Sequence, residues 1–167
     1  MNALALLKKQ HDEVDALIAR IETASKAKDT RRKQAAFLQL ADNLAAHVKI
    51  EETIFYPAVT AKQLEDTLLE SLEEHLSIKR VLTDLLEIDI DDPRFDAKLS
   101  VMKETNEHHT REEEEKELFP EVAKLLDSNE LERLGDEMLA KFESLMMGAP
   151  RDKVATETAE AAPLPTA

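Results

Sequence analysis

Two stretches of this chain repeat one arrangement of imidazole and carboxylate side chains. His47 precedes Glu51 by four residues, and His109 precedes Glu113 by the same spacing. Four residues along an α-helix cover about 6 Å and leave both side chains on one face, so each pair can address one metal ion or two neighbouring ions. The repeat therefore predicts two helices that present similar metal ligands.

A further histidine stands upstream of each pair. His11 lies 36 residues before His47, and His75 lies 34 residues before His109. A buried imidazole or carboxylate is costly unless it is paired or coordinates a metal. Two hairpins that each supply two histidines and one glutamate would offer mixed nitrogen and oxygen donors to a dinuclear site, with ions roughly 3.5–4 Å apart.

The composition restricts the chemistry of such a site. The chain has no cysteine, which excludes thiolate zinc sites, iron–sulfur clusters and disulfides. Histidine and carboxylate suit iron, manganese or zinc, and the ligand types alone do not choose among them.

Charge and hydropathy restrict the partners. Lys and Arg total 22 against 36 Asp and Glu, a formal charge of −14, which argues against nucleic acid or an anionic membrane as a partner. No apolar run is long enough for a membrane span or a secretory signal, so we expect a cytoplasmic protein. The sequence favours no oligomeric state.

The elements that must position these residues are helices. Two Gly, six Pro and few aromatic residues in 167 describe an all-α chain. The histidines fall within apolar stripes of helical period, as in Leu4, Leu7, His11, Val14 and Ile18.

Connections between these stripes are short, which predicts an antiparallel up-down-up-down four-helix bundle. Residues 2–60 and 65–126 would form its two hairpins, and a shorter fifth helix after Asp127 or Ser128 would pack across one end. We expect one domain over residues 1–148 and a disordered tail over 149–167, which has little to bury.

These motifs resemble a known family. The order of His11, His47-x3-Glu51, His75 and His109-x3-Glu113, closed by Phe-Tyr-Pro and Leu-Phe-Pro, is similar to the hemerythrin-like HHE cation-binding family over about residues 4–126. The resemblance implies a non-haem di-iron centre that binds dioxygen or responds to oxidative and nitrosative chemistry. It would hold two iron ions, with Glu51 and Glu113 bridging.

The chain departs from that family at Lys79. Hemerythrins that carry oxygen usually have a second histidine one turn after the third-helix ligand, where this chain has Lys79. The departure predicts an open coordination position. Tyr56 and Glu52 are the candidate substitutes for the absent nitrogen donor.

A second departure concerns register in the fourth helix. His47 and Glu51 precede Pro57 by ten and six residues, whereas His109 and Glu113 precede Pro120 by eleven and seven. One extra residue must be absorbed, for example by a π-bulge, which is often found at functional sites. His109 with Glu113 keeps the four-residue spacing and is preferred, while His108 with Glu113 or with Glu112 is the alternative.

Several functions fit this chemistry. The leading hypothesis is a di-iron protein that binds dioxygen or a related small ligand in oxygen, redox or iron homeostasis. An enzyme acting on peroxide, nitric oxide or ferrous iron, and an iron-responsive sensor module, are the alternatives. A metal-free helical bundle is the least functional interpretation.

Overall fold

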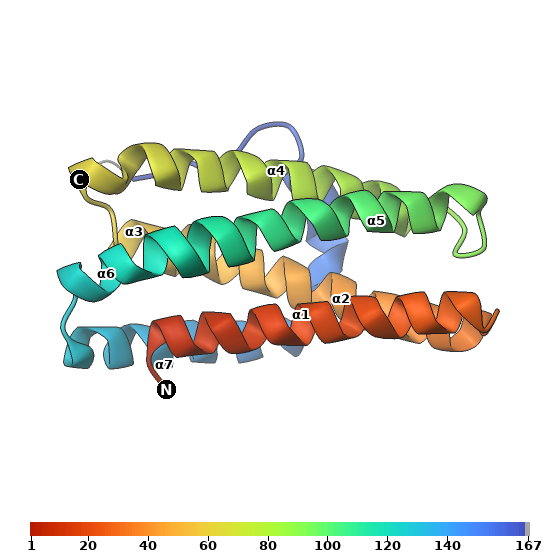
Figure 1. Ribbon diagram of the computed structural model, residues 1–167, viewed down its shortest axis with the longest axis horizontal. Helices are drawn as coiled ribbons and strands as arrows, with labels where there is room; N and C mark the ends of the chain where they lie inside the picture. Colours follow the sequence, from red (N-terminus) through yellow and green to blue (C-terminus); the bar gives the residue numbers. More distant parts are fainter. Residues whose placement is uncertain (166–167) are drawn as a thin grey trace.

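The structure, a computed structural model, describes residues 1–165, and within them four long helical segments lie side by side (Figure 1). The first is α1 and the third is α4, which follows a short 3-10 helix, η2. The second and fourth are each an α-helix that continues through a π-helix into a short α-helix. Their bounds are α1 Ala3–Lys26; α2 Thr30–Ile50, η1 Glu51–Phe55 and α3 Tyr56–Ala58; η2 Lys62–Leu64 and α4 Glu65–Glu87; and α5 Pro93–Glu107, η3 His108–Leu118 and α6 Phe119–Leu125.

Polar residues cap the start of three of the four helical segments. The Asn2 side chain accepts a hydrogen bond from the Ala5 N–H at 2.8 Å and caps α1. Asp29 caps α2 in the same way. Asp92 caps α5 with proline at the next position, where the missing N–H costs nothing. Short turns reverse the chain at each end, and those before α2 and α5 carry a capping aspartate.

The helices run up, down, up and down (Figure 1). α1 and α2 form one hairpin, and α4 and α5 form the other. The all-α bundle predicted from the sequence is confirmed.

Two apolar clusters fill the bundle on either side of a polar layer. One contains Leu7, Phe55 and Phe119, and the other contains Ile18, Phe37 and other residues nearer the far end. The polar layer is made by buried histidines and glutamates that interrupt each helix's apolar stripe. The clusters exclude water from this layer above and below.

The fifth helix differs from its prediction. α7, Ser128–Met146, is 19 residues long and lies along α1 and α2 instead of across the end of the bundle (Figure 1). A capping box between Asp127 and Glu130 starts it, as the sequence led us to expect at this point. Leu131, Leu134 and Met138 face the core cluster that contains Leu7, so its apolar stripe is satisfied lengthwise.

The segment expected to be disordered is structured in its described part. Residues Pro150–Glu157 form a 3-10 helix, η4, which lies against α2 and α4. Val154 is buried beneath it, and Arg151 forms an ion pair with Asp42. Arg80 donates to the carbonyl oxygens of residues 158 and 159 at 3.0 and 3.2 Å. One buried side chain and these polar contacts hold the segment as far as residue 159, and Ala161, Ala162 and Leu164 pack against the core cluster that contains Leu7. Residues 166–167 lie outside the described residues.

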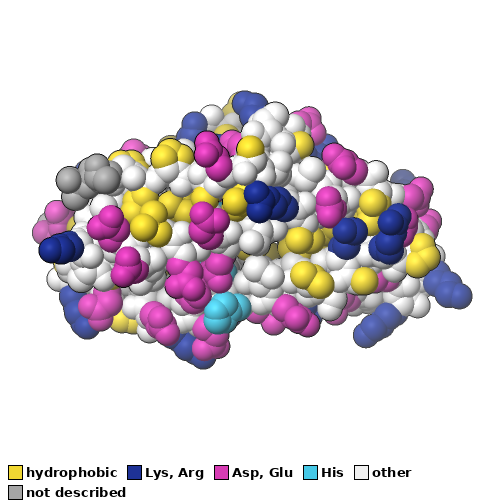
Figure 2. All heavy atoms as spheres, turned by 90° about the horizontal axis from the view of Figure 1, so that it is seen from above, with side chains coloured by type: hydrophobic (Ala, Val, Ile, Leu, Met, Phe, Trp, Pro, Cys, Tyr) yellow, Lys and Arg dark blue, Asp and Glu magenta, His cyan; other side chains and the backbone are white. Residues whose placement is uncertain are grey.

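Acidic side chains are spread over the face seen in Figure 2, where a histidine also reaches the surface. Among the described helices, none has the length and apolar character needed to cross a membrane.

Candidate metal centre

Four histidines from four helical segments meet in the polar layer. His11 comes from α1, His47 from α2, His75 from α4 and His109 from η3, and all are buried. The Nε2 atoms of His75 and His109 are only 3.0 Å apart. The structure thus brings together the four histidines that the sequence analysis singled out at these positions.

Each of these rings turns one nitrogen inward and one outward. An acceptor at each Nδ1 holds the ring in place and turns Nε2 toward the centre, the arrangement typical of metal-ligating histidines. The outer acceptors are Glu115 for His11 at 2.7 Å, Gln10 for His47 at 2.8 Å, Glu52 for His75 at 3.3 Å and Glu74 for His109 at 2.7 Å.

Two glutamates, both 0% exposed, complete the centre. A Glu51 carboxylate oxygen lies 3.2 Å from the Nε2 atoms of both His47 and His75. A Glu114 oxygen lies 3.2 Å from His11 Nε2 and 3.9 Å from His109 Nε2. Glu51 and Glu114 therefore each lie between two imidazoles.

Glu114 occupies the place that the sequence analysis assigned to Glu113. The chain is a π-helix from His108 to Leu118, so residues five apart, such as His109 and Glu114, share a face. Glu113 turns outward instead, with 15% of its side chain exposed. The expected π-helical geometry is present and runs past both residues, and it makes Glu114 the central carboxylate instead of Glu113.

The sequence does contain a signal for Glu114. Glu51 precedes Pro57 by six residues, and Glu114 precedes Pro120 by six. In both halves the residue before proline donates its N–H to the carbonyl of the central glutamate, five residues back. Counting back from proline, instead of forward from histidine, would have identified this carboxylate.

His108 and Glu113 lie together outside the centre. His108 is 61% exposed, and its Nε2 lies 3.1 Å from a Glu113 oxygen. Glu74 stands beside them and bonds His109 from its outer side. The open choice between His108 and His109 therefore resolves geometrically, because only His109 points its ring into the buried layer.

Electrostatics in the layer are dominated by burial. Burial and the neighbouring Glu114 carboxylate raise the pKa of Glu51 well above its usual value. Burial lowers the pKa of His47 and of His75. Burial also opposes charge on His109, yet the nearby carboxylates, Glu114 first and then Glu113 and Glu74, raise the pKa of His109 well above 6.5. One imidazolium and one carboxylate thus face each other without metal.

Tyr56 adds a hydroxyl to the layer. Its O–H donates to a Glu114 oxygen at 2.8 Å and lies 3.3 Å from His75 Nε2. Burial raises the pKa of Tyr56 well above 10. Of the two substitutes considered for the absent third-helix nitrogen, Tyr56 is therefore inside the centre, whereas Glu52 binds the outer nitrogen of His75.

The buried atoms fit metal ions better than they fit one another. Nε2 of His11 and His47, both Glu51 oxygens and one Glu114 oxygen are buried and have no hydrogen-bond partner. A buried polar atom without a partner costs roughly 1–3 kcal/mol. Two overlapping groups have donor atoms within 4.8 Å of one another: His11, His47, Glu51 and Glu114, and Glu51, His75 and His109. Cations at these places would satisfy the orphaned atoms.

The match to known families agrees with this donor set. The model of the Hemerythrin HHE cation binding domain matches residues 2–122. The chain belongs to the hemerythrin HHE cation-binding domain family. It is a helical protein of a metal-binding family, and its histidine and glutamate clusters could hold metal.

Similar sequences occur both as proteins of comparable length and as part of a longer one. A DNA nickase of Nostoc sp. is 26% identical over 140 residues, which are 84% of this chain but only 39% of the nickase. Uncharacterized proteins of Mycobacterium bovis and Mycobacterium tuberculosis are 28% identical over 151 residues, 90% of each chain. A crystal structure of an HHE domain-containing homologue from Mycobacterium kansasii has a TM-score of 0.73 and 25% identity, over 95% of this chain and 94% of that one.

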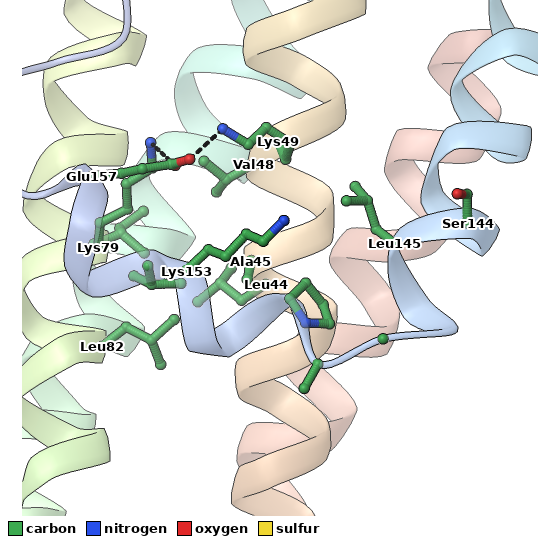
Figure 3. Close-up of a pocket in the computed structure, with 15 residues that line it drawn as sticks. Leu44, Ala45, Val48, Lys49, Lys79, Leu82, Ser144, Leu145, Lys153 and Glu157 are labelled. Carbon is green, nitrogen blue, oxygen red and sulfur yellow. Dashed lines mark hydrogen bonds and ion pairs between the residues drawn. The ribbon is translucent and has the colours of Figure 1, made fainter.

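In this HHE chain, Lys79 closes one side of the centre. Its side chain is 8% exposed, and its ammonium lies 2.8 Å from Glu52. Outside it, a cavity of about 320 Å³ opens between α2, α4 and η4, lined by residues such as Leu44 and Leu82 (Figure 3). The position where oxygen carriers have their additional histidine is therefore occupied by an ion pair between the centre and this cavity.

Proposed function

We propose that this protein holds two iron ions between its four buried histidines and two buried glutamates, and binds dioxygen or a related small ligand there. The observation that carries the proposal is the set of buried, unpartnered Nε2 and carboxylate atoms aimed at one another in a dry layer. Nitrogen and carboxylate donors suit iron, and also zinc or manganese.

Different residues of the chain would bridge the two ions, orient the ligands and leave room for the small ligand. Glu51, common to both donor groups, and Glu114, which lies near imidazoles of each, are the candidates to bridge two ions. The outer acceptors keep each imidazole oriented with its lone pair inward. The side lined by His75 and Tyr56 has fewer donors, so we assign the small-ligand position to this side.

Metal stoichiometry tests the proposal. Protein reconstituted anaerobically with ferrous iron should retain two ions per chain, and exposure to oxygen should give the absorption of an oxo-bridged diferric pair. A His47→Ala variant should lose stoichiometric iron, while His108→Ala, on the exposed face, should keep it. Failure of the unaltered protein to bind iron, or binding of zinc alone, would contradict the proposal.

Tyr56 favours a second candidate, an enzyme that reduces peroxide or nitric oxide or oxidises ferrous iron. When bound, a ferrous pair supplies two electrons, and reduction of one peroxide to two waters also consumes two protons. The buried Tyr56 hydroxyl lies where it can deliver a proton to a ligand beside His75. Turnover with peroxide, in place of a stable oxygenated form, would support this candidate, and slower turnover in Tyr56→Phe would assign the proton to Tyr56.

A further inference from the structure

A chain of charged contacts links the C-terminal segment to the centre. Glu157, on η4, pairs with Lys49 and lies 3.1 Å from the Lys79 ammonium (Figure 3). Lys79 in turn lies 2.8 Å from Glu52. The segment expected to be disordered thus supplies one end of a buried network.

The other end of this network is a histidine of the centre. Glu52 accepts from both the Lys79 ammonium and the His75 Nδ1–H, the latter at 3.3 Å. Its side chain is 2% exposed, so water cannot replace either donor. Any change in how strongly Lys79 holds Glu52 must therefore alter the bond from Glu52 to His75.

We infer that Glu157 is a positioning residue for His75, acting through Lys79 and Glu52. The inference rests on the proposed function in taking His75 as a metal ligand. Because Glu157 also pairs with the Lys79 ammonium, it weakens the attraction of Lys79 for Glu52. The Glu52 carboxylate can then accept more strongly from the His75 Nδ1–H. A well-accepted Nδ1–H makes the opposite nitrogen a stronger donor to metal.

The charges along the network alternate, as this role requires. Burial would raise the pKa of Glu157, but the bonds from Lys49 and Lys79 lower it. The Lys79 ammonium lies between the two carboxylates, 2.8 Å from Glu52 and 3.1 Å from Glu157.

Neutralising Glu157 should draw Glu52 toward Lys79 and away from His75. In Glu157→Gln the imidazole then donates less to iron, which disfavours the ferric state. We expect a more positive reduction potential and a severalfold loss of metal affinity. Glu52→Gln should act in the same direction and more strongly, by the roughly 10–100-fold typical of groups that support a metal ligand.

The matched control is Asp42→Asn. This change breaks another ion pair of the same segment, between Asp42 and Arg151, which does not touch Glu52 or His75. It loosens the segment without altering the network. Thermal unfolding of both variants would report the loss of packing, and only Glu157→Gln should shift the reduction potential.

A metal-free measurement separates this inference from the proposed function. The Nδ1–H resonance of His75, followed by NMR in metal-free protein, should move toward a weaker hydrogen bond in Glu157→Gln and stay in place in Asp42→Asn. That shift supports the network even in protein that binds no iron. Equal resonances and equal potentials in the two variants would overturn the inference while leaving the iron centre standing.

Discussion

Replacing each of two adjacent glutamates by glutamine, one at a time, tests the π-helical register of the fourth helical segment. Glu114→Gln removes a fully buried carboxylate that lies 3.2 Å from His11 Nε2. The glutamine has nearly the same size, and its amide oxygen can still accept a hydrogen bond from the Tyr56 hydroxyl, so the packing should change little. Glu113→Gln, the matched control, changes the neighbouring carboxylate, which faces His108. Only the first change should impair metal binding.

The size of the effect can be worked out for zinc, which is redox-inert and fits these ligands. At a free zinc concentration of 100 Kd, one site adds about 2.7 kcal/mol to the free energy of unfolding. For a chain of this size that raises Tm by about 5–11 °C. Mutating a group that hydrogen-bonds to a metal ligand lowers metal affinity by up to about 100-fold. Loss of a direct ligand should therefore weaken zinc binding by at least about 100-fold. The same zinc then adds only about 0.4 kcal/mol, or about 1–2 °C.

Scanning calorimetry with and without zinc measures both variants against their own metal-free baselines. We expect Glu113→Gln to keep most of the rise in Tm and Glu114→Gln to lose nearly all of it. The reverse result would show that Glu113 is the ligand and that the π-helical register is wrong. Equal, full rises in both would refute the role of Glu114.

Three further changes probe the layer and the packing around it. Tyr56→Phe removes a buried hydrogen bond to the Glu114 carboxylate and should lower the free energy of unfolding of metal-free protein by about 1.5–3 kcal/mol; an unchanged denaturant midpoint would contradict this. Because the pKa of His109 is raised well above 6.5, zinc must displace a proton there at pH 7, so affinity should rise with pH. Calorimetric titrations in buffers of different ionisation enthalpy should detect the released proton, and identical heats would disprove it. Gly135→Ala would bring a Cβ within 2.2 Å of the Met1 carbonyl oxygen and should cost about 1–3 kcal/mol by thermal unfolding, whereas Gly148→Ala meets only an ordinary contact and should cost less.

Local rules predicted the helices and the buried histidines. Asp92 followed by Pro93 marks a helix start in any context, and the apolar stripe around His11 requires a core-facing ring. These signals lie within a few residues of one another. They can therefore be recognised from the sequence without knowing which other segments pack against them.

Two features depended on distant contacts or on an uncommon helix. Glu114 was missed because a four-residue spacing assumes α-helical geometry, while η3 brings residues five apart onto one face. The tail was expected to be disordered because residues 149–167 contain few apolar side chains. Its order comes instead from Asp42, Lys49 and Lys79, which lie far away in the sequence.

The two donor groups of the centre differ in their number of ligand atoms, and this affects how metal occupancy depends on metal concentration. One group offers four ligand atoms and the other three, with Glu51 common to both. Two identical ions bound as proposed would therefore have two different binding constants, and occupancy should rise in two steps as metal concentration increases. At scarce metal, the predominant species would be a half-loaded chain with its His75 side vacant. The fraction of chains competent for two-electron chemistry would then depend on metal supply more steeply than the total bound metal does.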